Sequence, residues 1–203
     1  MSPAVFAKSA IQEITEWGGE VLVKGLRKDQ FYQLTARHPE LLMEREKNGD
    51  IRIMTPVKGG SGLRENNLSY YLMDWCKKQK QGMAFSPRTG FDLPDGSIKS
   101  PDTSWISDEK MAQLSPEKIE NEYIKVVPDF VVELRSESDS IIKLRNKMSD
   151  TWIANGVRLG WLMDPYEEKV HIYREDGSIE IVSGFDKRLS GETVLPGFNL
   201  ELS

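Results

Sequence analysis

The sequence predicts a mixed α/β domain with a central sheet. Apolar residues recur at helical spacing in three stretches, residues 28–36, 63–80 and 140–155. Short apolar runs typical of strands lie between and after these stretches, and Asn-Gly and Asp-Gly pairs mark turns between several of them. The predicted order is therefore helix, hairpin, helix, three strands, helix and further strands.

The composition is that of a folded protein without a membrane span. The chain has 203 residues, 38% hydrophobic and 29% charged, and a formal net charge of −5. We expect a loosely attached arm at residues 1–24 and a single domain at residues 25–203. No apolar run approaches the roughly 18 residues that cross a bilayer, and the N-terminus lacks the apolar stretch of a signal peptide. A cytoplasmic protein with no membrane partner is expected. The acidic charge argues mildly against tight nucleic-acid binding without excluding it.

The cysteine and histidine content narrows the chemistry. Cys76 is the single cysteine, which excludes an internal disulfide and a cysteine zinc cluster. The two histidines, His38 and His171, have no neighbouring ligand at metal spacing. Zinc chemistry and Ser-His-Asp catalysis are therefore disfavoured. Carboxylate chemistry remains, and its natural partners are hard cations such as Mg²⁺.

The first elements are a helix and a hairpin. Residues 28–36 form the helix, and residues 41–46 and 51–54 form the hairpin strands. Asn48-Gly49 between the two strands predicts a type I′ turn.

A Gly- and Pro-rich loop at residues 55–62 then leads to the clearest helix of the first half, residues 63–80, with Gly82 as its stop. Glu65 lies in the first turn of this helix. It either complements the helix dipole or contributes to a site.

Strands follow within residues 83–91 and 98–107, and residues 108–122 are a polar excursion. Residues 127–165 then contain a strand, a polar turn, an amphipathic helix that ends at Asn155-Gly156, and a second strand. A hairpin and a final strand complete the chain.

Three acidic residues lie at or inside predicted core strands. Asp102 and Asp129 each follow a proline at the start of an apolar strand, where an aspartate can also satisfy local N–H groups of an entry turn. Glu133 lies between apolar residues in mid-strand. A buried carboxylate needs a cation or strong donors, so Glu133 is either a metal ligand or half of a buried ion pair. The interpretation of Glu133 as a metal ligand is favoured.

Strand geometry selects the partner of Glu133. Asp129 and Glu133 share a face but lie about 13 Å apart, because a strand rises roughly 3.3 Å per residue. They cannot chelate one ion. Asp102, on a neighbouring strand, can reach Glu133 in a suitable register, which leaves Asp129 as a supporting or capping residue. Lys143 and Lys147 lie one helical turn apart on the next helix, and Lys147 is adjacent to its buried side. Lys147 either stabilises a phosphate or is a solvated helix lysine.

Residues 128–165 resemble the Uma2 family, a group of proposed endonucleases common in cyanobacteria and formerly a domain of unknown function. The resemblance extends over about residues 28–200. It is carried by four segments: MTPVKGG, SPDTSWIS, PDFVVELRSESD and NGVRLGWLMDP.

This family is grouped with the PD-(D/E)XK nuclease superfamily. The resemblance implies a restriction-endonuclease-like αβββαβ core with a mixed central sheet, here with an N-terminal helix and β-hairpin and a C-terminal β-hairpin added. It also implies a divalent metal, Mg²⁺ or Mn²⁺, and hydrolysis of phosphodiester bonds. Asp102 would be the metal-binding aspartate, Glu133 the acid of the (D/E)XK element, and Glu65 an auxiliary acid.

The sequence departs from the superfamily pattern at the lysine. Arg135 occupies the expected position, two residues after the acid, and the resemblance points to Lys147 as the replacement. The spacing from Lys147 to Trp152 is one residue longer than the usual step from lysine to aromatic, which a helix bulge can absorb. Lys143 and Arg135 are the alternative candidates.

The leading hypothesis is a Mg²⁺-dependent DNA endonuclease with Asp102, Glu133 and Lys147 as catalytic residues. The alternative is an inactive nuclease fold that binds nucleic acid or protein, and a third possibility is a hydrolase of small phosphate esters. The tryptophans and hairpin edges are compatible with a homodimer.

Overall fold

The computed structural model describes residues 21–202, which group into two compact units. One unit contains residues 21–57 and 92–99, and the other contains residues 58–91 and 100–202.

The arm expected at residues 1–24 falls largely outside the described residues. Its last part, Val21–Val23, forms strand β1, which pairs antiparallel with β3. That residues 25–203 make a single domain stays a prediction.

The first unit is built on a sheet with the strand order β1-β3-β2-β6-β5. Its elements are α2 (Lys28–Arg37), β2 (Leu42–Arg45), β3 (Ile51–Met54), β6 (Ile98–Lys99) and β5 (Phe91–Asp92), which spans the boundary to the second unit. The predicted helix and hairpin are therefore confirmed. Phe31 of α2 and Ile51 and Ile53 of β3 are fully buried in this unit. Lys99 is also buried and pairs with Glu44 at 3.1 Å.

The turn of the hairpin differs from the expected type I′. The Glu46 N–H donates to the Asp50 carbonyl at 2.7 Å, and the Gly49 N–H donates to the Glu46 carbonyl at 2.9 Å. Gly49 has φ +91°, whereas Asn48 is not left-handed. A type I′ turn needs two left-handed residues, but a three-residue loop with a type I turn needs only one. The extra residue therefore changes the turn while the strand pairing is kept.

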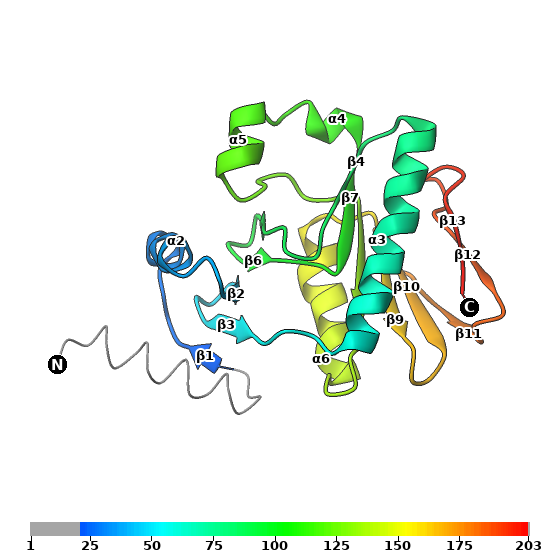
Figure 1. Cartoon of the computed structure of the whole chain (residues 1–203), viewed down its shortest axis with the longest axis horizontal. Helices are drawn as coiled ribbons and strands as arrows, with labels where there is room; N and C mark the ends of the chain where they lie inside the picture. Colours follow the sequence, from blue (N-terminus) through cyan, green and yellow to red (C-terminus); the bar gives the residue numbers. More distant parts are fainter. Residues whose placement is uncertain (1–20, 203) are drawn as a thin grey trace. The chain divides into compact units, whose positions relative to one another are not determined.

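The second unit contains a mixed sheet with the order β11-β10-β9-β8-β7-β4 (Figure 1). Its strands are β4 (Met83–Phe85), β7 (Thr103–Ile106), β8 (Phe130–Leu134), β9 (Leu159–Asp164), β10 (Lys169–Arg174) and β11 (Ile179–Ser183). Neighbours pair antiparallel except β8 and β9, which are parallel. With α3 before β4 and α6 between β8 and β9, this gives the predicted αβββαβ core. A separate pair of strands, β12 (Arg188–Ser190) and β13 (Asn199–Glu201), forms the C-terminal hairpin.

Helix α3 (Gly59–Gln79) begins four residues earlier than expected. The loop predicted at residues 55–62 therefore contributes its last residues to the helix, and Ser61 in this first turn is buried. At the other end Lys80, with φ 54°, takes the left-handed capping position expected of Gly82. Gly82 is left-handed as well, and an added Cβ there would meet the Ile106 carbonyl and the Trp105 ring.

The helix predicted at residues 140–155 has three conformations in succession. It begins as α6 (Ile141–Asn146), continues as a π-helical turn (Lys147–Trp152) and ends as a 3₁₀ turn (Ile153–Asn155). Gly156 follows with φ +102°, as the predicted left-handed cap requires. The π turn is the bulge that the long spacing between Lys147 and Trp152 suggested.

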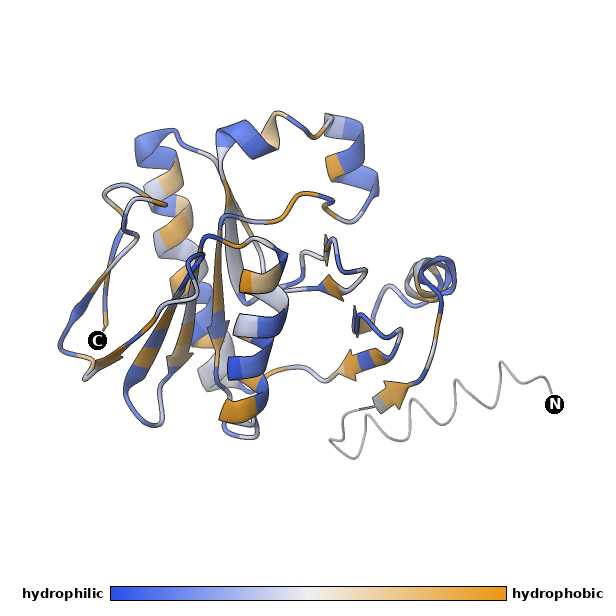
Figure 2. Cartoon of the chain, turned by 180° about the vertical axis from the view of Figure 1, so that it is seen from behind, coloured by the Kyte–Doolittle hydropathy of each residue, from blue (hydrophilic) through white to orange (hydrophobic). Residues whose placement is uncertain are grey.

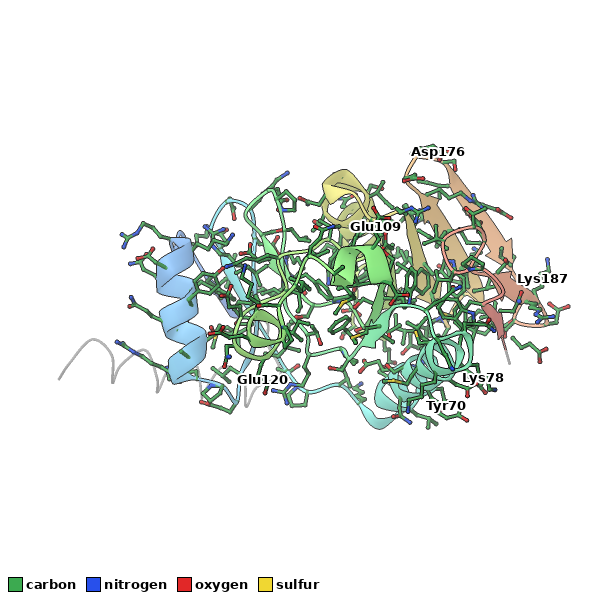
Figure 3. All side chains as sticks on the ribbon, turned by 90° about the horizontal axis from the view of Figure 1, so that it is seen from above. Tyr70, Lys78, Glu109, Glu120, Asp176 and Lys187 are labelled. Carbon is green, nitrogen blue, oxygen red and sulfur yellow. The ribbon has the colours of Figure 1, made fainter. Side chains whose placement is uncertain are left out.

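The two long helices cover opposite faces of the sheet. In Figure 3, α3, marked by Tyr70 and Lys78, lies on one side and α6 on the other. The α3 face contains the main apolar core, which includes Trp75, Phe130 and Trp161. Successive strand residues point to opposite faces, so Glu133, next to Val132 of this core, faces α6.

The excursion at residues 108–122 forms two short helices, α4 (Asp108–Met111) and α5 (Pro116–Asn121). Both are largely hydrophilic in Figure 2 and bury none of their own residues. Within residues 21–202, no helix combines the length and apolar character needed to span a membrane.

Candidate functional site

Asp102 and Glu133 lie close together where strands β7 and β8 pair. The β7–β8 register ends with Thr103 as the partner of Val132, and Asp102 directly precedes Thr103 while Glu133 directly follows Val132. The Asp102 N–H donates to the Val132 carbonyl at 3.0 Å, so Asp102 and Thr103 both lie beside Val132 at this end of the ladder. The charge of Glu133 acts on the Asp102 carboxyl, which indicates that the two side chains are near one another.

The Asp102 carboxylate also takes the place of a backbone acceptor. The N–H of Leu134 donates to its Oδ2 at 2.6 Å. The aspartate after Pro101 therefore ends the β7–β8 ladder with its side chain, because the chain leaves the strand at this point. Asp102 therefore closes the strand entry with its side chain, and this role is compatible with a contribution to the proposed site.

Glu133 is buried and binds two donors at one oxygen. Its side chain is 5% exposed. Lys147 Nζ lies 2.9 Å from Oε1, and the Trp152 indole N–H donates to the same oxygen at 2.7 Å. Lys147 Nζ also lies 5.9 Å from the centre of the Trp152 ring. Glu133 is therefore half of a buried ion pair, and this pairing is compatible with its proposed role as a site residue.

The electrostatic environment couples the carboxylates. Burial, followed by the charge of Glu133, raises the pKa of Asp102 well above its usual range, and Glu65 adds to this effect. The Leu134 N–H and the Lys147 ammonium oppose the rise. Burial also raises the pKa of Glu65, which lies half-buried on α3. The negative charges of Asp102, Glu133 and Glu65 therefore repel one another. A cation close to Asp102 and Glu133 would relieve this repulsion.

The other predicted residues lie at different places. Asp129 precedes β8, where its carboxylate accepts from the Ser107 N–H at 2.8 Å and pairs with Lys110 at 2.9 Å. It therefore anchors the start of α4. Arg158 approaches the same carboxylate at 3.9 Å.

The two alternative cations also differ from Lys147 in their surroundings. Arg135 donates to Asp164 Oδ2 at 2.7 Å and to the Asp139 carbonyl at 3.3 Å. Lys143 is exposed on α6. Of the three candidates, Lys147 is the one whose ion pair with Glu133 the structure shows directly.

Asp102 and Glu133 fit a hard divalent cation. Within the described chain, no group of three or more His, Cys, Asp or Glu side chains is arranged to hold an ion. Mg²⁺ does not require such a group, because it is usually bound by one or two carboxylates and keeps several of its waters. Two neighbouring carboxylate side chains, one of them with a raised pKa, supply oxygen ligands of the kind that such an ion takes.

One contributor cannot be recognised from the sequence. Trp152 is fully buried, and its indole donates to Glu133 in addition to packing there. The signal in the sequence is the spacing of five residues between Lys147 and Trp152, which indicates a helix bulge. That spacing carries no information on the partner of the indole N–H.

The fold and the paired carboxylates define the chain as a protein of the restriction-endonuclease-like class. Residues 28–203 match the model of the Uma2 family, described as "Putative restriction endonuclease", and the chain belongs to this family. A solved structure from Anabaena variabilis, described as a "putative nuclease belonging to DUF820", has the same fold with a TM-score of 0.65 and 20% sequence identity. The match covers 79% of this chain and 87% of that chain. The search of curated proteins gave no match.

Proposed function

We propose that the protein is a divalent-metal-dependent endonuclease that hydrolyses DNA phosphodiester bonds. One observation carries the proposal: Asp102 and Glu133 lie close together at the end of the β7–β8 ladder while Lys147 contacts Glu133. Membership of a family described as restriction endonucleases supports the same chemistry. The ion would be Mg²⁺ or Mn²⁺, because the ligands are carboxylate oxygens.

The residues of this chain have separable tasks in the proposal. Asp102 and Glu133 would hold the ion, which when bound supplies a water of lowered pKa and neutralises phosphate charge. Lys147 pairs with Glu133 in its buried position and would present a positive charge where negative charge develops on the phosphate. Glu65, beside Asp102, would orient water as an auxiliary acid. Asp129, Arg135 and Lys143 take no direct part, because the first two are bound elsewhere and Lys143 is exposed.

The direct test is cleavage of plasmid DNA in Mg²⁺ or Mn²⁺. Glu133→Ala should lose at least 100-fold in rate, because it removes a ligand and leaves Lys147 without this carboxylate. The matched control is Glu120→Ala, which removes an exposed carboxylate on α5 (Figure 3) and should cleave like the wild type. Equal cleavage by Glu133→Ala and Glu120→Ala would refute the site.

The same experiment separates the alternative functions. An inactive nuclease fold that serves as a binding module would neither cleave DNA nor bind the ion in calorimetry at millimolar concentration. A small phosphate-ester hydrolase would act on nucleotides while leaving plasmid DNA intact. Either result would replace the endonuclease proposal.

We also propose a homodimer formed through strand β11, an outer strand of the six-stranded sheet. Ile179 and Ile181 of β11 are 54% and 53% exposed, which is unusual for the edge of a sheet. Antiparallel pairing of two copies about Ile181 would place Glu180 opposite Val182 of the second copy. No like charges would then meet, and the isoleucines of both copies would form one apolar row.

Light scattering coupled to size-exclusion chromatography tests the dimer. Ile181→Lys should give a monomer because it places a charge at the centre of the pairing. Met83→Lys is the control, since Met83 is 53% exposed on β4 at the opposite edge of the sheet. A monomeric wild type, or a dimer that survives Ile181→Lys, would contradict this arrangement.

A further inference from the structure

Two side chains of the π turn converge on one carboxylate oxygen. Lys147 begins the turn and Trp152 ends it, and both contact Glu133 Oε1, at 2.9 Å and 2.7 Å. The turn is closed by an i→i+5 bond in which the Ile153 N–H donates to the Met148 carbonyl. Met148 and Trp152 are fully buried, so the turn is fixed against the sheet.

The π conformation favours this convergence. At 100° per residue, side chains five apart in an α-helix point about 140° away from each other. A π turn has more residues per turn than an α-helix, so it brings residues i and i+5 closer to one side of the helix. In this turn Lys147 and Trp152 both reach the same carboxylate. Such bulges cost stability, and their presence is frequent at functional sites.

A second buried tryptophan offers a comparison. Trp161 is as fully buried as Trp152, but it lies on the α3 face of the sheet and its indole nitrogen has no hydrogen-bond partner among residues 21–202. The bond from the indole to Glu133 therefore distinguishes Trp152 from Trp161.

We infer that Trp152 is a positioning residue: its indole N–H and the Lys147 ammonium together fix the plane of the Glu133 carboxylate toward the ion that Glu133 and Asp102 would share. This inference rests on the proposed function. A donor that orients a metal-binding side chain typically contributes 10- to 100-fold to metal affinity. Cation–π attraction between Lys147 and the indole keeps the two donors together.

The first test compares metal binding by two matched variants. Trp152→Phe and Trp161→Phe both shrink a fully buried tryptophan, but only the first removes a bond to Glu133. Calorimetric titration with Mn²⁺ should show binding at least about 10-fold weaker in Trp152→Phe than in Trp161→Phe. Equal affinity in the two variants would overturn the inference.

A measurement on the wild type serves if Trp152→Phe does not fold. The indole ¹H–¹⁵N signal of Trp152 should move on titration with Mg²⁺, whereas that of Trp161 should stay in place. A purely structural tryptophan would not respond, so a static Trp152 signal at saturating Mg²⁺ would overturn the inference.

The outcome also distinguishes the inference from the proposed function. If the wild type binds neither Mg²⁺ nor Mn²⁺, the metal-dependent function fails and the positioning role falls with it. If the wild type binds the ion and Trp152→Phe binds it equally well, the positioning role alone fails.

Discussion

Replacing Lys147 by methionine separates the energy of its ion pair from its packing. Methionine keeps most of the aliphatic length of the side chain and removes the charge 2.9 Å from Glu133 Oε1. The Glu133 side chain is 5% exposed and that of Lys147 is 19% exposed. Removing one partner of a buried pair costs about 3–5 kcal/mol because the other charge is left uncompensated. Since Lys147 is partly solvated and Trp152 still donates, we expect the lower end, about 3 kcal/mol.

The assay is urea unfolding at pH 8 in the presence of a chelator, with Lys143→Met as the control. Lys143 lies one turn earlier on the exposed side of the helix, and its replacement should change the free energy of unfolding by no more than about 0.5 kcal/mol.

Magnesium should restore part of the lost stability. An ion that binds the folded state with a Kd of about 1 mM stabilises it by roughly 1.4 kcal/mol at 10 mM. If Lys147→Met and Lys143→Met unfold at the same urea concentration with and without Mg²⁺, both the ion pair and the cation site are refuted as described.

Three further predictions concern pH and backbone. The pKa of Asp102 is higher in the folded than in the unfolded protein. Protonated Asp102 therefore stabilises the folded state below the unfolded pKa of about 3.9, and this stabilisation is lost as pH rises through the folded pKa. Asp102→Asn should remove this part of the pH dependence of chelator-treated protein in urea titrations. Burial and the charge of Arg145 lower the pKa of His171 in the folded protein. The neutral imidazole therefore contributes to the stability of the fold above about pH 6.5, and this contribution is lost as pH falls through the folded pKa. His171→Gln should accordingly unfold less readily in acid than the wild type. Gly82→Ala should lower stability by about 3 kcal/mol in thermal unfolding, because its Cβ would meet the Ile106 carbonyl in a left-handed backbone; an unchanged melting temperature would contradict this.

Strand geometry is what the sequence contributes to the proposed site. Two residues four apart on one strand cannot share an ion, so the sequence pairs Glu133 with Asp102 instead of Asp129. In the structure Asp102 and Glu133 lie at the same end of the β7–β8 ladder, and their joint binding of an ion stays a prediction. The spacing of Lys147 and Trp152 is one residue longer than the usual step in the resembling family, and the bulge that can absorb it is present as the π turn.

Other features depended on tertiary contacts that no local pattern contains. Arg135 occupies the motif position of a catalytic lysine, yet it is held by Asp164 at the end of β9. Helix α3 extends back to Gly59 although glycine costs about 1 kcal/mol per helical residue, and in this first turn Ser61 is buried while Gly59 and Gly60 are exposed. The left-handed cap lies at Lys80, which is exposed, rather than at Gly82.

The charges of the proposed site are consistent with both a lysine and a bound ion. With Asp102 and Glu133 ionised, Lys147 compensates only one of the two negative charges. The raised pKa of Asp102 is the response of the protein alone, because a proton removes the excess charge. In the proposal a divalent cation would do the same. With Glu65 also ionised, the three acids, Lys147 and the cation would balance to zero, so the ion would remove the repulsion among the acids without leaving an excess charge of either sign.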